Sequence, residues 1–222
     1  MRSAQTLLTL LSLSAAACAG APAQAAPPRA ASHSGKLATA VLAGGCYWTM
    51  ETVFEHVRGV VDVVSGMSDA EWLPATSAGR RPSPPLRVES VRITYDPAVV
   101  TYADLLHIFF TVAHDPTQVD RQGPDVGVRY RSAVLYTDTT QFREATDYIG
   151  RLEREGTFRA AIATRVVALR DFAPVPAEQQ DFAVRHPDDP YIVTWDRPKL
   201  AHFREVMPEW YVERGSEGAP AR

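Results

Sequence analysis

The chain has 222 residues, 45% of them hydrophobic and 22% charged, which is the composition of a soluble globular protein long enough for one domain with a real core. Its 23 basic and 26 acidic side chains nearly balance. We therefore expect neither nucleic acid nor an anionic membrane surface as a partner.

The N-terminal residues have the pattern of an export signal. Arg2 gives a positive start, Leu7 to Ala17 form an apolar stretch, and Ala23-Gln24-Ala25 offers a small-x-small cleavage site. We predict a signal peptide over residues 1–25 and a periplasmic or secreted protein. No apolar run reaches the ~20 residues that cross a bilayer, so no integral membrane contact is expected.

Cysteine content is the next informative feature, because the sequence holds only Cys18 and Cys46. We expect Cys18 to be lost with the signal peptide. In the alternative, a lipoprotein, Cys18 would carry lipid, but Ala15 three residues before it disfavours this. The mature protein then has one thiol and no internal disulfide. Such a thiol is either a small buried hydrophobe, which frequency alone favours, or a reactive group.

Residues 26–36 resemble a flexible leader, residues 37–213 a folded domain, and residues 214–222 a disordered tail. The apolar run 37–43 predicts a strand that ends in a sharp turn at Gly44-Gly45. A helix is predicted next from apolar residues at helical spacing and a terminating glycine: Met50, Val53, Phe54, Val57 and Gly59. Cys46 therefore falls between a strand and a helix.

Strands are predicted at 60–64 and 87–95, with Glu89 on the apolar face of the second, and the proline-containing segment 65–86 is predicted to be a long, functional loop. Thr101 and Asp104 form a capping box for the next helix. The remaining elements follow: a polar loop at 121–127, strands at 129–137 and 162–169, a helix from a Thr139 cap to Gly156, a short helix at 177–185, and a last helix carrying Leu200, Phe203 and Met207.

Strands interspersed with helices predict an α/β fold of the α+β type. We expect a two-layer sandwich in which helices pack on a mixed sheet, with a ferredoxin-like core.

The position of Cys46 favours a reactive thiol. A thiol is a nucleophile only as its thiolate, and unpaired amides and the macrodipole at a helix start, where Cys46 is predicted to lie, lower a thiol pKa. Tyr47 and Trp48 follow directly and can wall an apolar pocket for a methyl thioether or sulfoxide, although simple core packing is the alternative for Trp48.

Several polar residues are candidate partners of Cys46. Glu89, on an apolar strand face, can stay protonated and act as a general acid, unless it leans out to solvent. Asp125 is either a site residue or a turn cap, Tyr130 either a site residue or a core tyrosine, and His114 most simply braces its helix end. The six histidines are scattered and no phosphate loop is present, so neither a metal nor a cofactor is expected.

From about Leu37 to Pro187 the chain closely resembles the A-type peptide methionine sulfoxide reductases. The resemblance is carried by separated motifs in the family's order: Gly44-Gly45-Cys46-Tyr47-Trp48 with Glu51, His114-Asp115-Pro116-Thr117, Arg121-Gln122-Gly123-Pro124-Asp125, and Tyr130-Arg131-Ser132.

The resemblance implies reduction of the S epimer of methionine sulfoxide, free or in proteins, through attack by Cys46 and a Cys46 sulfenic acid. It implies that Glu89 protonates the sulfoxide oxygen and that Asp125 and Tyr130 complete the polar side of the pocket. It also implies that Tyr47 and Trp48 hold the substrate methyl group.

Three departures from the family pattern bear on activity. Tyr47 replaces the usual phenylalanine, and its hydroxyl needs a partner. A second family tyrosine would fall near Ser77, and Gly66 to Ala70 lacks the usual Gly-Tyr-x-Gly-Gly, so we expect a slower enzyme. No cysteine follows Cys46, so a thioredoxin-like, glutaredoxin-like or small-molecule thiol must reduce it from outside.

Two other functions remain compatible with these residues. Cys46 is also the expected reactive group of a redox sensor or thiol peroxidase, which would pass through the same sulfenic acid. The altered loop would also suit a non-catalytic module that binds oxidised methionine through Trp48.

Overall fold

The structure, a computed structural model, describes residues 35–70 and 87–213. The predicted signal peptide, most of the leader, the tail and Ser77 lie outside the described residues. The first half contains, in chain order, β1 (Ala38–Ala43), α1 (Tyr47–Glu55), β2 (Val60–Ala70), β3 (Arg87–Tyr95), α2 (Tyr102–Ile108) and the π-helix η1 (Phe109–Ala113).

The second half begins with irregular structure and ends in a helical segment. Its elements are β4 (Arg121–Gln122), β5 (Asp125–Val126), η2 (Val128–Tyr130), β6 (Ala133–Tyr136), α3 (Thr139–Glu155), β7 (Arg165–Pro174), η3 (Ala177–Gln179), α4 (Phe182–Arg185), the π-helix η4 (Ile192–Asp196) and α5 (Arg197–Val206).

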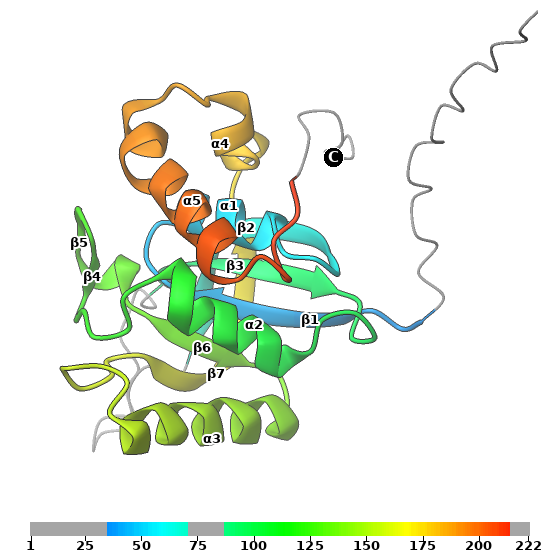
Figure 1. The fold of residues 1–222 in the computed structure, drawn as a ribbon, viewed down its shortest axis with the longest axis vertical. Coiled ribbons are helices and arrows are strands. Elements are labelled where there is room, and N and C mark those ends of the chain that lie inside the picture. Colours follow the sequence, from blue (N-terminus) through cyan, green and yellow to red (C-terminus); the bar gives the residue numbers. More distant parts are fainter. Residues whose placement is uncertain (1–34, 71–86, 214–222) are drawn as a thin grey trace, which may run out of the picture. The chain divides into compact units, whose positions relative to one another are not determined.

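Five strands pair in the order β1-β3-β2-β7-β6, and β6 pairs in turn with β1, so the sheet closes on itself (Figure 1). Among these five described strands, only β6 and β7 run parallel to each other. The predicted mixed sheet with packed helices is confirmed. The closed ring differs from the open sheet of the predicted two-layer sandwich, and this strand order does not confirm a ferredoxin-like core.

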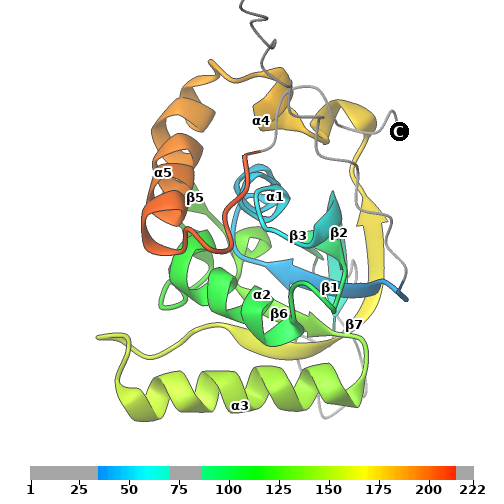
Figure 2. The ribbon, with the colours of Figure 1, turned by 45° about the vertical axis from the view of Figure 1, so that its right-hand side comes forward.

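Helices lie around this sheet and at one end of it. Both views place α3 on one side, near β6 and β7, and α4 and α5 on the opposite side, near α1 (Figures 1 and 2). The core between sheet and helices contains fully buried side chains from α1 and α2, among them Met50, Phe54, Leu105 and Leu106. Among the described residues, no helix is long and apolar enough to cross a membrane.

The strand β2 corrects the prediction of a loop from residue 65. It continues to Ala70 because its backbone pairs with β3 on one side and with β7 on the other. Met67, for example, lies opposite Glu89 of β3, and Asp69 lies opposite Asp171 of β7. The small residues Gly66, Ser68 and Ala70 hid this strand in the sequence. A Cβ on Gly66 would collide with the Phe172 ring on β7. These pairings fix the position of Glu89.

Helix ends differ from prediction by a few residues. The capping box of Thr101 and Asp104 is confirmed. Asp138, one residue before the predicted Thr139, caps α3 by accepting hydrogen bonds from two backbone N–H groups. The first helix ends at Glu55, and Gly59 instead adopts a left-handed turn at φ 86° before β2.

Candidate active site

The turn from β1 into α1 places Cys46 at the N-cap of the helix, between strand and helix as predicted. Gly45 has φ 101°, a conformation that side chains disfavour. A Cβ on Gly44 would lie 2.6 Å from the Met50 sulfur and 2.9 Å from the Phe109 ring. Both glycines are therefore required for α1 to begin close against the core with Cys46 at its start.

The Cys46 side chain is a free thiol that is 9% exposed. Burial, and then the negative charge of Glu89, raise its pKa to about 12, whereas hydrogen bonds from the backbone N–H groups of Trp48 and Thr49 and a hydrogen bond with Tyr191 lower it. The pKa-lowering effect expected from a helix start is present at Cys46 but is outweighed by desolvation. Cys46 must lose its proton as it reacts.

Glu89 projects from β3 into the interior beside the helix start and is only 4% exposed. Its Oε2 accepts a hydrogen bond from the Tyr47 backbone N–H at 3.1 Å, and its Oε1 lies 3.1 Å from Nε of Arg129. Burial raises the pKa of Glu89 to about 7 even though these two partners lower it. A large fraction of the protein molecules therefore carries a proton on this carboxyl group near neutral pH.

The aromatic pair after Cys46 is covered by the segment between β7 and α5. The Tyr47 hydroxyl donates to Gln179 Oε1 at 3.4 Å, which gives the extra hydroxyl a partner. Trp48 stacks on Phe182, with ring centroids 3.7 Å apart and an interplanar angle of 6°. Trp48 Nε1 is buried with no hydrogen-bond partner among the described residues, so one polar atom of this wall is left for a ligand or water.

Asp125 comes from β5 and Tyr130 from η2. Burial is the largest cause of the raised pKa of Tyr130, and the negative charges of Glu89, Asp125 and Cys46 raise it further. These four groups therefore lie close enough to interact electrostatically. Asp125 Oδ2 accepts a hydrogen bond from the Tyr191 hydroxyl at 2.6 Å. The predicted site residues are thus brought together, although their catalytic roles stay predictions.

His114 has a structural position. Its Nδ1 bonds the Phe109 carbonyl at 2.9 Å, and its Nε2 lies 2.7 Å from the Ser132 hydroxyl. Burial lowers its pKa to about 3, so the ring is neutral. It ties the end of η1 to the start of β6 and lacks the charge of an acid catalyst.

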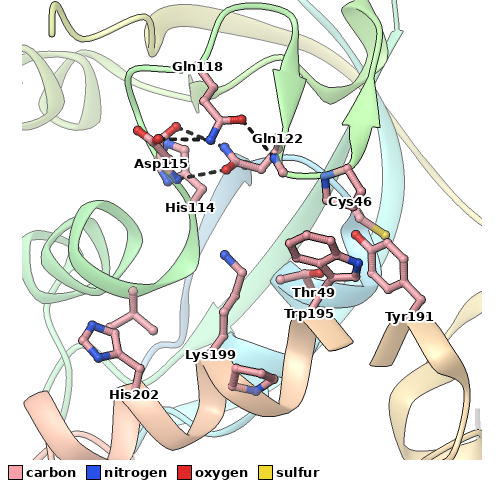
Figure 3. Close-up of a pocket in the computed structure, with 15 residues that line it drawn as sticks. Cys46, Thr49, His114, Asp115, Gln118, Gln122, Tyr191, Trp195, Lys199 and His202 are labelled. Carbon is pink, nitrogen blue, oxygen red and sulfur yellow. Dashed lines mark hydrogen bonds between the residues drawn. The ribbon is translucent and has the colours of Figure 1, made fainter. Parts of the chain in front are cut away.

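A cavity of about 440 Å³ borders Cys46 (Figure 3). It runs past Tyr191 and Trp195 toward Lys199, whose ammonium group donates to the Ala113 carbonyl at 3.0 Å. A molecule in this cavity would reach Cys46 from the solvent side.

Glu51, the glutamate of the first sequence motif, lies in an acidic cluster with Glu55 and Asp181. It is the one cluster with metal-ligand spacing among the described residues. Burial, reinforced by the two neighbouring acids, raises the pKa of Glu51 to about 8, and its Oε2 accepts from the Asp181 backbone N–H at 3.0 Å. A protonated carboxyl group is a poor cation ligand. The cluster instead anchors the start of α4 on α1.

The sequence pattern described as peptide methionine sulfoxide reductase (PMSR) matches residues 38–210. A relative named peptide methionine sulfoxide reductase MsrA 2, from Synechocystis sp., is 47% identical over 75% of this chain and 78% of its own length. The chain belongs to the peptide methionine sulfoxide reductase family. Another MsrA 2, from Mesorhizobium japonicum, is 41% identical over 79% of this chain and 90% of its own.

Two solved structures are similar to this chain. Methionine sulfoxide reductase A of Corynebacterium diphtheriae has a TM-score of 0.54 at 29% identity, over 68% of this chain and 76% of its own. Reduced Mxr1 from Saccharomyces cerevisiae has a TM-score of 0.58 at 23% identity, over 69% and 88%, which shows a shared fold.

The reductase site includes three residues that sequence reasoning missed. Gln179, Phe182 and Tyr191 contact Tyr47, Trp48 and Asp125 from far along the chain. Their contacts join residues far apart in the chain, so no local motif marked them.

Proposed function

We propose that Cys46 of this reductase reduces the S epimer of methionine sulfoxide, free or in proteins, and is left as a sulfenic acid that an external thiol reduces. The observation that carries this proposal is the buried, partly protonated Glu89 carboxyl group held beside the start of α1 by the Tyr47 N–H. A protonated acid next to a nucleophile suits the reduction of a polar S–O bond.

The chemical step balances with these two groups. Glu89 donates its proton to the sulfoxide oxygen while the Cys46 sulfur bonds to the sulfoxide sulfur. Transfer of the oxygen, as hydroxyl, to the Cys46 sulfur then releases the thioether and leaves Cys46 as –S–OH. The thiol proton of Cys46 returns to Glu89, so the sulfoxide gains two electrons and Cys46 loses two.

The aromatic wall explains why a methyl sulfoxide is the proposed substrate. Tyr47 and Trp48 meet edge to face at 6.1 Å, and Phe182 fixes the Trp48 ring from behind. Aromatic faces pack well against S-methyl groups. Asp125 and Tyr130 supply the polar side of the pocket, where the sulfoxide oxygen would be bound.

Regeneration must use a thiol from outside, because no cysteine lies between residues 47 and 222. One thiol attacks the sulfenic acid, releases water and forms a mixed disulfide, and a second thiol then frees Cys46. A thioredoxin-like or glutaredoxin-like protein or a small thiol fits this role. The export signal proposed for residues 1–25 would place the reaction in the periplasm or outside the cell.

The test is an epimer-resolved assay with dithiothreitol as reductant. We expect turnover of a peptide carrying the S sulfoxide and none of the R sulfoxide. Turnover of hydrogen peroxide without sulfoxide turnover would replace the reductase by a thiol peroxidase.

A Cys46→Ser variant is the matched control for that assay. It should lose turnover while keeping the thermal unfolding midpoint of the wild type, since serine replaces a thiol of similar size. Binding of the sulfoxide by a wild type as inactive as this variant would show a non-catalytic binder instead.

A further inference from the structure

Trp195 is a large aromatic residue that the fold holds at the surface beside the active site. Its side chain is 41% exposed, although tryptophan is on average well buried. It lies on the π-helix η4, between the buried residues Ile192 and Asp196. Asp196 accepts a hydrogen bond from Thr49 on α1. The buried residues therefore fix η4 on the helix that begins after Cys46, and the Trp195 ring stays accessible.

The ring borders the same cavity of about 440 Å³ as Cys46 (Figure 3). It lies against the turn between β4 and β5, since a Cβ on Gly123 would be 3.8 Å from two atoms of the indole. Further apolar surface of the cavity comes from three side chains: Val112, Pro124 and Pro198. An apolar group could therefore enter the cavity and pack on the indole.

This cavity adjoins the pocket proposed for the methyl sulfoxide. Among the described residues that line it, Cys46 is the one that also belongs to that proposed sulfoxide site. Tyr191 links the two spaces, because it lines the cavity, donates a hydrogen bond to Asp125 and meets Trp48 edge to face at 6.0 Å. A methyl sulfoxide bound at Cys46 would therefore leave the chain that carries it beside the cavity.

The charges at the cavity do not favour a charged occupant. Lys199 and Asp115 both line it and are of opposite sign. The Lys199 ammonium group donates to the Ala113 carbonyl, and the Asp115 carboxylate accepts from the side chains of Thr117 and Gln118. Both charges are already engaged within the protein, whereas the indole offers an open apolar ring for stacking.

We propose that Trp195 is a specificity-determining residue, which binds the apolar side chain of a residue next to methionine sulfoxide in a protein substrate. An aromatic neighbour fits best, because it can stack on the indole. Tryptophan is also one of the residues that contribute most to binding where proteins meet. This inference rests on the proposed function, since the sulfoxide must lie at Cys46 for its neighbour to reach the ring.

The first measurement is binding to a Cys46→Ser protein, in which no turnover intervenes. Labelled peptides carry the S sulfoxide between two phenylalanines, two glycines or two glutamates, and fluorescence anisotropy gives their Kd. We expect the phenylalanine peptide to bind about two- to tenfold more tightly than the glycine peptide. Adding Trp195→Ala should remove this preference. Adding Val193→Ala, a 41% exposed residue of η4 outside the cavity lining, should keep it.

The same substitutions are then compared in proteins that retain Cys46, in single turnover without reductant. Trp195→Ala should reduce the phenylalanine peptide about two- to tenfold more slowly than wild type at low peptide concentration. It should reduce free methionine S-sulfoxide at the wild-type rate, because that substrate has no neighbouring residue. Trp195→Phe, which keeps an aromatic ring, should recover most of the loss, and Val193→Ala should match wild type.

Three results overturn the inference. The first is an equal preference for phenylalanine with and without Trp195. The second is a preference for the glutamate peptide, which would assign the cavity to Lys199. The third is a Trp195→Ala defect confined to the reduction of oxidised Cys46 by a thioredoxin-like protein, because the ring would then serve the reductant. Turnover of free methionine sulfoxide reports on the proposed function by itself, so a failure of that function is seen separately.

Discussion

Cys46 and Glu89 are coupled acids in one small site. The charge of Glu89 contributes to the raised pKa of Cys46, and burial leaves Glu89 itself half-protonated near pH 7. A proton on Glu89 therefore serves twice: it removes a charge that opposes the thiolate and it is available to the sulfoxide oxygen.

This coupling predicts the pH profile of a Glu89→Gln variant. Wild-type activity should fall as the pH rises through about 7, because the raised pKa of Glu89 means that the protonated acid is lost there. The variant should be about a hundredfold slower near pH 6 and should lack this fall. Steady-state kcat/KM for the S-sulfoxide peptide between about pH 5 and 9 measures both effects.

Glu153→Gln, an exposed change on α3, is the control and should keep the wild-type profile. A Glu89→Gln profile that still falls through about pH 7 would assign the titration to another group and remove Glu89 as the acid.

At the residue scale, the sequence indicated the polar and aromatic components but not their environment. The motifs pointed to Cys46 and Trp48, the apolar strand face pointed to Glu89, and all three lie together. The sequence could not show that burial would outweigh the helix start at Cys46, since desolvation depends on neighbours from the whole fold. Tyr191 was missed for the same reason.

The segment from η3 to η4 is the element on which the aromatic wall depends. Phe182 covers one face of Trp48, and Asp181 before it adopts φ 51°, an uncommon conformation for aspartate, with its N–H held by Glu51. Non-glycine residues keep such a backbone only where surrounding contacts impose it. The segment is therefore positioned by α1 as well as packed on it.

We expect Phe182→Ala to loosen the methyl pocket. Loss of the stacked pair should lower kcat/KM for the S-sulfoxide peptide about two- to tenfold and shift tryptophan fluorescence to longer wavelength. Phe142→Ala, which removes a 40% exposed ring on α3, is the matched control. Equal activity of Phe182→Ala and wild type would mean that Trp48 needs no support from this segment.

A helix remote from the site tests the opposite case. Asp138 caps α3 with hydrogen bonds to the N–H groups of Thr140 and Gln141 at 2.8 and 2.9 Å. Asp138→Ala should lower the free energy of unfolding by about 1 kcal/mol in urea titration and leave kcat/KM unchanged. Asp147→Ala, in the exposed middle of α3, should cost less, and an equal loss in both variants would contradict the capping role.

Elements with strong local signals were predicted well, and those decided by pairing were not. The capping box at Thr101 and the glycine end of α3 depend on neighbouring residues, so the sequence showed them. The end of β2 and the shift of the last strand to 165–174 depend on β2 pairing with β7, which is far away in sequence. The closing of the sheet through β1 and β6 is a further long-range event.

At the scale of the whole molecule, buried acids link stability to pH. The pKa of Glu51 is raised from 4.5 to about 8, so the folded state holds a proton that the unfolded state releases between these values. The free energy of unfolding should therefore fall as pH rises from about 4.5 to 8, with a slope of up to about 1.4 kcal/mol per pH unit from this group.

Glu51→Gln should reduce that slope in urea titrations across this range, because the amide keeps an oxygen for the Asp181 N–H and cannot ionise. The exposed Glu205→Gln on α5 should leave the slope as it is in wild type. A slope unaltered in Glu51→Gln would show that Glu51 does not carry this proton.

The fold and the site support one central claim, that Cys46 takes the oxygen from the S sulfoxide. The most direct measurement is mass spectrometry after mixing the protein with the S-sulfoxide peptide and no reductant. We predict about one equivalent of methionine peptide and one added oxygen at Cys46. In a parallel sample, a sulfenic-acid reagent should label Cys46 instead. Methionine formation without oxidation of Cys46, or equal yields from the R epimer, would contradict the account.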